Sequence, residues 1–274
     1  MKHYSIIGNP LSHTLSPILH NYWFKKYKIE GNYTSLEIKK EDIEKIIIKI
    51  REKQIEGVNI TLPFKQKVIP FIDKLVNDAK ETNSVNTIYL NSENLVVGDN
   101  TDVFGLQAGY LKEITSSKTE NKKALIMGAG GVAPSVILAL KKSNINNIFI
   151  TNRTYEKSLI LQKKFTNIKI IKWEVIEEKI KNFDIVINAT SLGLKNGNDF
   201  NFLFRNFKKE MIYIDTIYNP LETKMLKHLK LNRIKTFNGL NMFVYQGQKS
   251  FYMWTKINPE IDSELIDLLT SKIK

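Results

Sequence analysis

A glycine-rich loop between an apolar run and a helical pattern is the feature that most restricts how this chain can fold. The run Ala124-Leu-Ile-Met127 predicts a buried strand, and residues 132–142 predict a helix with Pro134 in its first turn, where a missing N–H costs little. The loop between them contains Gly128, Ala129, Gly130 and Gly131, a variant of the dinucleotide-binding fingerprint. Small residues there let the backbone approach a pyrophosphate at the helix N-terminus. A plain tight turn is the alternative interpretation.

Further strand patterns follow at the spacing of a doubly wound parallel sheet. We expect strands at residues 148–151, 168–171, 185–188 and 211–215, separated by helical or loop sequence. Two helices, at residues 240–256 and 262–270, are split by Asn258-Pro259. They have no strand of their own to cover, so we expect them to pack back on another part of the chain.

The residues after the second strand of this half favour NADP over NAD. Folds that bind NAD usually place an acidic residue there for the ribose 2′-hydroxyl. This chain has Asn152, Arg153 and Thr154 instead, with Lys157 one turn later. A guanidinium, a hydroxyl and an ammonium suit a 2′-phosphate. The alternative, an ordinary surface charge at Arg153, is weakened because the chain contains only four arginines.

The first hundred residues alternate strand-like runs with a helical pattern, which indicates a second α/β layer. We expect strands at residues 4–7, 33–38, 58–61, 87–90 and 95–97. Residues 42–53 carry Ile43, Ile46, Ile47 and Ile50 at helical spacing and predict an amphipathic crossover helix.

Polar residues gather at the turns and strand ends of this first half. Asn59 and Thr61 alternate on one face of a strand that ends in Pro63-Phe64-Lys65, and Asp102 stands where a strand gives way to a helix. Hydroxyls, amides, one Lys and one Asp at strand ends suit a polyhydroxylated, anionic small molecule. Each has a structural alternative, since Asp102 and Ser16 could each cap a helix.

Composition excludes several other classes of protein. The chain has 274 residues, which suggests two domains, and no cysteine, which excludes a disulfide scaffold, a thiolate metal site and a Cys nucleophile. No run of about 18 apolar residues occurs, so we expect neither a signal peptide nor a membrane span. The formal net charge is +13, but the lysines are spread along the chain and arginines are scarce, so we expect no nucleic-acid partner.

Several short motifs occur in order along nearly the whole chain. They are Gly8-Asn-Pro with Ser16-Pro17, Asn59-Ile-Thr-Leu-Pro-Phe-Lys65, Val85-Asn-Thr87, Gly98-Asp-Asn-Thr-Asp102, Gly128-Ala-Gly-Gly131, Asn152-Arg-Thr154, Asn188-Ala-Thr-Ser191 with Gly193, Tyr218-Asn-Pro220 with Thr223, and Gly239-Leu240 with Met242 and Gln246. Each motif alone is weak or moderate, whereas the ordered set is specific. In this order the motifs resemble those of the shikimate dehydrogenase family.

The resemblance implies an α/β substrate domain, residues 1–102 completed by helices within 237–274, and a Rossmann-like, doubly wound NADP domain at residues 103–236. It implies reversible, NADP-dependent reduction of 3-dehydroshikimate to shikimate, with Lys65 and Asp102 as the catalytic pair. Thr14, Ser16 and Tyr218 would face the substrate carboxylate, and Asn59, Thr61, Asn86 and Gln246 the ring hydroxyls. The cofactor would be lined by Gly128, Ala129, Gly130, Gly131, Val132, Asn152, Arg153, Thr154, Lys157, Thr190, Thr216, Gly239 and Met242.

Two departures from the family pattern keep alternatives open. Thr14 stands where the family usually has Ser, so a quinate or dual quinate/shikimate dehydrogenase is the runner-up. Lys157 stands where many NADP-using members carry a second Arg, so we expect NADP preference to be retained but to be less sharp. A non-catalytic sensor should have lost part of the catalytic set, and this chain retains it.

We expect a cytoplasmic enzyme with a small-molecule substrate. The four histidines lack metal-ligand spacing, so no metal is expected. The sequence does not distinguish a monomer from a homodimer.

Overall fold

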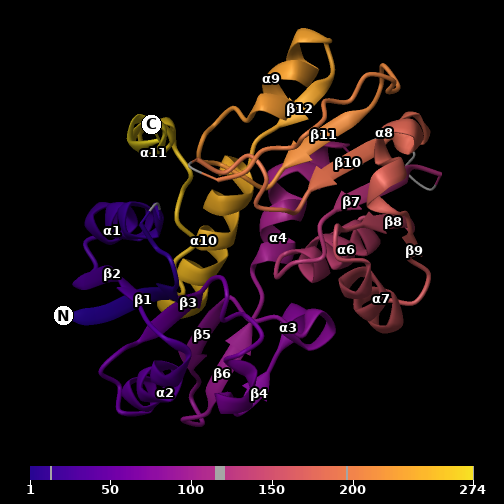
Figure 1. The fold of residues 1–274 in the computed structure, drawn as a ribbon. Helices are drawn as coiled ribbons and strands as arrows, with labels where there is room; N and C mark the ends of the chain where they lie inside the picture. Colours follow the sequence, from indigo (N-terminus) through magenta and orange to yellow (C-terminus); the bar gives the residue numbers. More distant parts are fainter. Residues whose placement is uncertain (13, 115–120, 196, 274) are drawn as a thin grey trace. The chain divides into compact units, whose positions relative to one another are not determined.

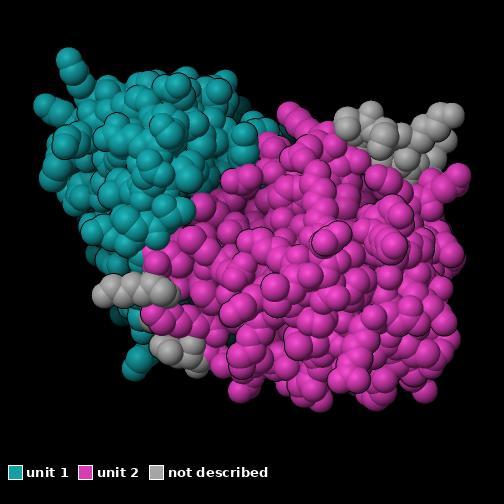
Figure 2. Space-filling view, turned by 90° about the horizontal axis from the view of Figure 1, so that it is seen from above, with its two compact units in different colours: residues 1–105, 244–272 teal, residues 106–243, 273–274 magenta. Residues whose placement is uncertain are grey.

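The computed structural model describes residues 1–12, 14–114, 121–195 and 197–273. The chain divides into two compact units, coloured separately in Figure 2. Unit 1 consists of residues 1–105 and 244–272, and unit 2 consists of residues 106–243 and 273–274. Within the described residues, each unit is built on one six-stranded sheet (Figure 1).

Unit 1 has a mixed sheet with the strand order β2-β1-β3-β5-β6-β4. Its elements are β1 (Lys2–Gly8), α1 (Ser16–Lys26), β2 (Gly31–Glu37), α2 (Ile43–Arg51), β3 (Gly57–Ile60), β4 (Lys74–Leu75), α3 (Asn77–Thr82), β5 (Thr87–Leu90), β6 (Val96–Asp99), the start of α4 (Asp102–Leu106), most of α10 (Leu240–Thr255) and α11 (Ser263–Lys272). β1 pairs in parallel with both β2 and β3, whereas β5 is antiparallel to β3 and β6. The expected α/β layer is confirmed.

One face of this sheet is covered by α2. Ile43, Ile46, Ile47 and Ile50 are all buried, and they share a core with the strand residues that point to that face. The predicted amphipathic crossover helix is confirmed; it begins one residue later and ends two residues earlier than expected.

The opposite face of the sheet carries aromatic side chains from α1 and α10. Tyr4 of β1 lies 5.0 Å from the ring of Phe24 in α1 and 5.2 Å from that of Trp254 in α10. Asp262, just before α11, accepts a hydrogen bond from Tyr22 Oη at 3.0 Å. The expectation that the C-terminal helices pack back on another part of the chain is therefore confirmed for unit 1.

His20 lies inside this aromatic layer. It is fully buried, stacks on Tyr33 at 4.4 Å, and its ring nitrogens have no hydrogen-bond partner among the described residues. Burial, only partly offset by the nearby Asn59 amide, lowers the pKa of His20 from 6.5 to about 3. His20 is therefore neutral in the folded protein at any pH above this value.

We expect the neutral His20 to make the fold acid-sensitive. Between about pH 6.5 and pH 3 the unfolded chain protonates His20 and the folded chain does not, so the free energy of unfolding falls as the pH falls. At about pH 5 the loss from this residue is about 2 kcal/mol relative to about pH 7.5. The variant His20→Phe keeps a stacked ring but has no titrating group. We expect urea unfolding to show that its free energy of unfolding falls by about 2 kcal/mol less between the two pH values than that of the unsubstituted chain. His3→Phe, at an exposed position, is the matched control, and an unchanged pH dependence in His20→Phe would contradict the assignment.

Unit 2 has a parallel sheet with the order β9-β8-β7-β10-β11-β12. Its elements are α5 (Lys112–Ile114), β7 (Lys123–Met127), α6 (Ala133–Lys142), β8 (Asn147–Thr151), α7 (Tyr155–Lys164), β9 (Lys169–Ile170), α8 (Ile176–Lys179), β10 (Ile185–Asn188), β11 (Ile212–Asp215), α9 (Lys224–Leu231) and β12 (Lys235–Phe237). All the strand pairs are parallel. The predicted doubly wound sheet is confirmed, and its order reverses between β7 and β10.

The sequence patterns missed the shortest elements and also the eleven-residue α1, whose buried face includes the polar Ser16 and His20. β4, α3 and β12 were not expected, because two to six residues carry too little periodicity to distinguish them from loops. Most expected strands agree with the observed ones to within about two residues. In the described part of the chain, none of the helices combines the length and apolar character needed to cross a membrane.

Candidate active site

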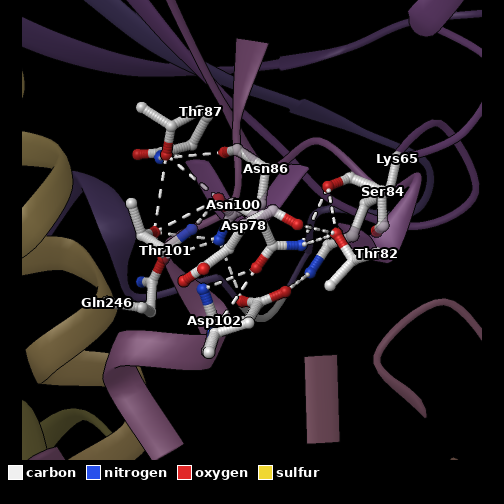
Figure 3. A network of polar contacts seen from close by, with 12 residues as sticks. Lys65, Asp78, Thr82, Ser84, Asn86, Thr87, Asn100, Thr101, Asp102 and Gln246 are labelled. Atoms are coloured by element: carbon white, nitrogen blue, oxygen red, sulfur yellow. Dashed lines mark hydrogen bonds and ion pairs between the residues drawn. The ribbon is translucent and has the colours of Figure 1, made fainter. Parts of the chain in front are cut away.

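Lys65 and Asp102 form a short ion pair in unit 1. Lys65 follows β3 by five residues, and Asp102 is the first residue of α4, just beyond β6. Figure 3 shows the two side chains meeting, with Lys65 Nζ 2.6 Å from Asp102 Oδ2. The side chains are only 11% and 7% exposed, so little water competes for them and the ammonium is held in one place.

Two asparagines hold Asp102 in this position. Asn86 Nδ2 donates to Asp102 Oδ1 at 2.9 Å, and Asn86 Oδ1 accepts from the Thr101 N–H at 2.7 Å. Asn100 Oδ1 accepts from the Asp102 N–H at 3.0 Å, so Asn100 caps α4. Because Asn100 caps the helix, the Asp102 carboxylate is available to bind Lys65 and Asn86. The alternative reading of Asp102 as a helix cap is wrong.

A buried serine of α10 joins the polar network (Figure 3 shows its neighbours). Ser250 Oγ accepts from Asn59 Nδ2 at 3.0 Å and lies 2.8 Å from Thr87 Oγ1 and 3.2 Å from Thr101 Oγ1. Gln246 lies one turn earlier on the same helix, with Oε1 3.5 Å from Thr101 Oγ1. The helix therefore presents both residues to the strand ends that carry the ion pair.

Asn59 and Thr61 lie on or just beyond β3, as the alternation predicts. Asn59 Oδ1 accepts from Tyr33 Oη at 2.7 Å, and its Nδ2 donates to the Asn86 carbonyl at 3.1 Å. Asn59 thus links the aromatic layer to the polar network. Thr61 lies against Gly8, where an added Cβ would come within 2.4 Å of Thr61 Cγ2, so only glycine fits beside it.

Thr14 and Ser16 meet at the start of α1. Thr14 Oγ1 donates to Ser16 Oγ at 3.2 Å and accepts from the Ser16 N–H at 3.3 Å. Ser16 is itself the first residue of the helix and does not cap it. Tyr218 belongs to unit 2, where its ring stacks on Phe243 at 4.6 Å.

The glycine loop of unit 2 joins β7 to α6. Gly128 has φ +109°, and a Cβ there would lie 2.8 Å from the Ala189 carbonyl oxygen, so the position requires glycine. No atom lies within 4 Å of a Cβ built at Gly130, so the backbone there borders open space. Ala133 begins α6 directly after Val132, which brings the positive end of a ten-residue helix to the loop. This cradle fits a pyrophosphate.

Asn152 ties the glycine loop to the end of β8. Its Oδ1 accepts from the Ala129 N–H at 3.1 Å, and its Nδ2 donates to the Thr154 carbonyl at 2.8 Å. Arg153 and Lys157 are exposed, and neither pairs with a carboxylate among the described residues. Two free cations next to the cradle suit a phosphate on the ribose and give an NAD ribose no acidic partner.

The remaining predicted cofactor residues follow the carboxyl ends of neighbouring strands. Thr190 follows β10, Thr216 follows β11 and Gly239 follows β12. A Cβ at Gly239 would lie 2.3 Å from the Thr216 carbonyl oxygen, so only glycine lets these two loops approach so closely. Met242, in the first turn of α10, is buried, and its N–H donates to Tyr110 Oη at 3.0 Å. Ligands of doubly wound sheets bind at this edge, beside the reversal of strand order.

No group of three or more His, Asp or Glu side chains is placed to hold a metal ion within the described ranges. The described residues supply a lysine, a carboxylate and neutral polar groups in unit 1, and a phosphate cradle in unit 2.

Comparisons with known proteins agree with this geometry. Residues 6–88 match the family model described as shikimate dehydrogenase substrate binding domain, and residues 110–232 match the model described as shikimate / quinate 5-dehydrogenase. A shikimate dehydrogenase (NADP(+)) of Pelagibacter ubique is 48% identical over 269 residues, which cover 98% of each chain. The chain belongs to the shikimate dehydrogenase family.

Solved structures of the shikimate dehydrogenase family have the same fold. The enzyme from Aquifex aeolicus superposes with a TM-score of 0.88 at 31% identity, covering 100% of this chain and 98% of that one. The enzyme from Thermus thermophilus, solved in complex with NADP(H) and shikimate, gives a TM-score of 0.87 at 28% identity, covering 99% and 100%.

Sequence reasoning missed Asn100 and Ser250 as members of the site. Asn100 carried a usable signal, since Asn two positions before a helix is a favoured cap. Ser250 is four residues beyond Gln246 on a predicted helix and so had to share its face. In both cases the side chain contributes through hydrogen bonds to other residues of the site, and a sequence motif does not reveal such bonds.

Proposed function

We propose that the chain catalyses the reversible, NADP-dependent reduction of 3-dehydroshikimate to shikimate, as a cytoplasmic enzyme. The observation that carries the proposal is the ion pair of Lys65 and Asp102, held by Asn86 in a family of this activity. A ketone becomes an alcohol by gaining a hydride at carbon and a proton at oxygen, and the site has one cation fixed for the second task.

Lys65 is the proton donor in this proposal. Its ammonium donates a hydrogen bond to the ketone oxygen, stabilises the negative charge that develops there, and transfers one proton to it. Asp102 keeps the ammonium aimed at one point through the 2.6 Å contact. NADPH supplies the hydride when bound. In the reverse direction Lys65, as the neutral amine, accepts the proton of the alcohol.

The other predicted residues bind and orient the two reactants. We assign Thr14, Ser16 and Tyr218 to the substrate carboxylate, and Asn59, Thr61, Asn86 and Gln246 to the ring hydroxyls or to the network behind them. The loop from Gly128 to Val132, with Asn152, Arg153, Thr154, Lys157, Thr190, Thr216, Gly239 and Met242, would hold the dinucleotide. Arg153 and Lys157 are assigned to the 2′-phosphate because no carboxylate among the described residues neutralises them.

Quinate oxidation is the second candidate function. Thr14 carries a methyl group that serine lacks, and its hydroxyl is engaged with Ser16. The shape of the site next to the proposed carboxylate subsite therefore differs from that of a Ser-bearing relative. A homodimer is compatible with either function, and the molar mass in solution tests it.

Initial rates of nicotinamide reduction with shikimate or quinate, each with NADP⁺ or NAD⁺, test the proposal. We expect rapid reduction with shikimate and NADP⁺ and slow reduction in the other three mixtures. Comparable rates with quinate would favour the second candidate, and no reduction in any mixture would contradict both.

A further inference from the structure

A buried carboxylate in unit 2 has no part in the chemistry described so far. Asp215 ends β11 and is the cross-strand partner of Asn188, which ends β10, and both side chains are fully buried. Asp215 Oδ1 accepts from Asn188 Nδ2 at 3.0 Å and from the Ile217 N–H at 3.1 Å, and Oδ2 accepts from Thr223 Oγ1 at 2.9 Å. Burial raises the pKa of Asp215 to about 7 against the lowering effect of these three donors.

Asp215 and the Leu192 carbonyl, which accepts from Asn188 Nδ2 at 3.1 Å, together fix which way the Asn188 amide is turned. An ionised carboxylate only accepts hydrogen bonds, so the amide must present its NH₂ group to Asp215. The amide oxygen then faces the other way, where it accepts from the Thr190 N–H at 3.0 Å and from Thr190 Oγ1 at 2.7 Å. A flipped amide would place its oxygen against the carboxylate and lose both bonds to Thr190.

Asn188 in turn orders both threonines next to the glycine loop. Its main-chain carbonyl oxygen accepts from Thr216 Oγ1 at 2.9 Å, whichever way the side-chain amide is turned, and its amide oxygen holds Thr190. Thr190 Cγ2 would lie 2.8 Å from a Cβ at Gly128, so Thr190 packs directly against the first glycine of the loop. The orientation set at Asp215 is thereby transmitted to the surface on which a dinucleotide would lie.

We propose that Asp215 is a positioning residue for dinucleotide binding, which acts through the Asn188 amide on Thr190. The inference rests on the proposed function, because Thr190 is assigned to the cofactor there. Asp215 is fully buried and its carboxylate accepts from Asn188, Thr223 and the Ile217 N–H, so its effect should appear in cofactor affinity rather than in the chemical step.

Replacing Asp215 with asparagine tests the inference. The neutral amide can turn its own NH₂ group toward Asn188, so the Asn188 amide loses one of its two acceptors and is held only by the Leu192 carbonyl and the groups of Thr190. We expect the Kd for NADP⁺, measured by isothermal titration calorimetry above the pKa of Asp215, to rise about tenfold, as for the loss of one or two hydrogen bonds. In assays with shikimate, the KM for NADP⁺ should rise in parallel while kcat changes by no more than about twofold.

Thr223→Val is the matched control. Thr223 donates to the same carboxylate but caps α9 and does not contact Asn188 in the described structure. It should lower the melting temperature and leave the Kd for NADP⁺ within about twofold of the original value. Equal weakening by Thr223→Val and Asp215→Asn would overturn the proposal, since it would mean general loosening of the unit.

A second variant, Thr190→Val, tests the same chain of contacts without touching the buried carboxylate, and its combination with Asp215→Asn gives a double-mutant cycle. Thr190→Val removes the hydroxyl that Asn188 holds and should weaken NADP⁺ binding by itself. Adding Asp215→Asn should then cost less than it costs alone, because both changes break one chain of contacts. Full additivity would overturn the proposal. An unsubstituted chain that binds no NADP⁺ would overturn the proposed function as well, whereas binding without shikimate oxidation would overturn only the substrate assignment.

Discussion

Replacing Lys65 with methionine is expected to lower kcat for shikimate oxidation by about 10²- to 10⁴-fold, the usual contribution of one positioned proton-transfer group. Methionine keeps an unbranched chain of similar length but carries no proton and no charge. The KM for NADP⁺ should change little, because Lys65 lies in unit 1 and the dinucleotide residues are assigned to unit 2. Steady-state rates of nicotinamide reduction, with circular dichroism to confirm folding, measure the effect.

Lys67→Met is the control for this prediction. Lys67 is exposed and lies over the Phe64 ring at 5.8 Å, so its loss removes the same charge without touching the ion pair. It should retain nearly full turnover. A Lys65→Met protein that turns over as fast as Lys67→Met would refute the role assigned to Lys65.

Replacing Arg153 with serine should reduce the preference for NADP⁺ over NAD⁺, as the ratio of kcat/KM values, by about 10- to 100-fold. The guanidinium is exposed and has no ion-pair partner among the described residues, so a 2′-phosphate would be its first charged partner. The change should come from weaker use of NADP⁺ and leave the NAD⁺ rate nearly constant. Lys157→Ser should act in the same direction and less strongly, because a lysine lacks the bidentate fork.

Lys163→Ser, at an exposed position near the other end of α7, is the matched control and should not alter the ratio. An Arg153→Ser protein with an unchanged ratio would show that Arg153 is a surface charge, which is the alternative the sequence left open.

The parts of the fold that could be predicted are those with long periodic patterns. The doubly wound sheet and its phosphate cradle were predicted from the buried run before Gly128, the glycine loop and the helix after it. The positive φ at Gly128 requires glycine, so the sequence carries a signal of this turn. The four isoleucines of α2 likewise defined a helix and its buried face. Short elements such as β4 and β12 depend on pairing with distant strands, which periodicity does not report.

The sequence predicted which residues belong to the candidate site better than it predicted the hydrogen bonds between them. Alternation placed Asn59 and Thr61 on one face, but the sequence offered both Asn100 and Asp102 as caps and did not show that Asn100 would cap α4 and leave Asp102 to Lys65. Nor did the sequence indicate that Asp215 and Asn188 would be cross-strand partners, since that depends on the register of β10 and β11. Contacts of this kind arise from tertiary packing and become visible only in the folded chain.

Conversion of 3-dehydroshikimate by the purified chain with NADPH is the most direct measurement of the central claim. We predict that shikimate, identified by chromatography, forms in a one-to-one ratio with the NADPH consumed, and that Lys65→Met forms almost none. NADPH consumption without shikimate, or no consumption by the unsubstituted chain, would contradict the account.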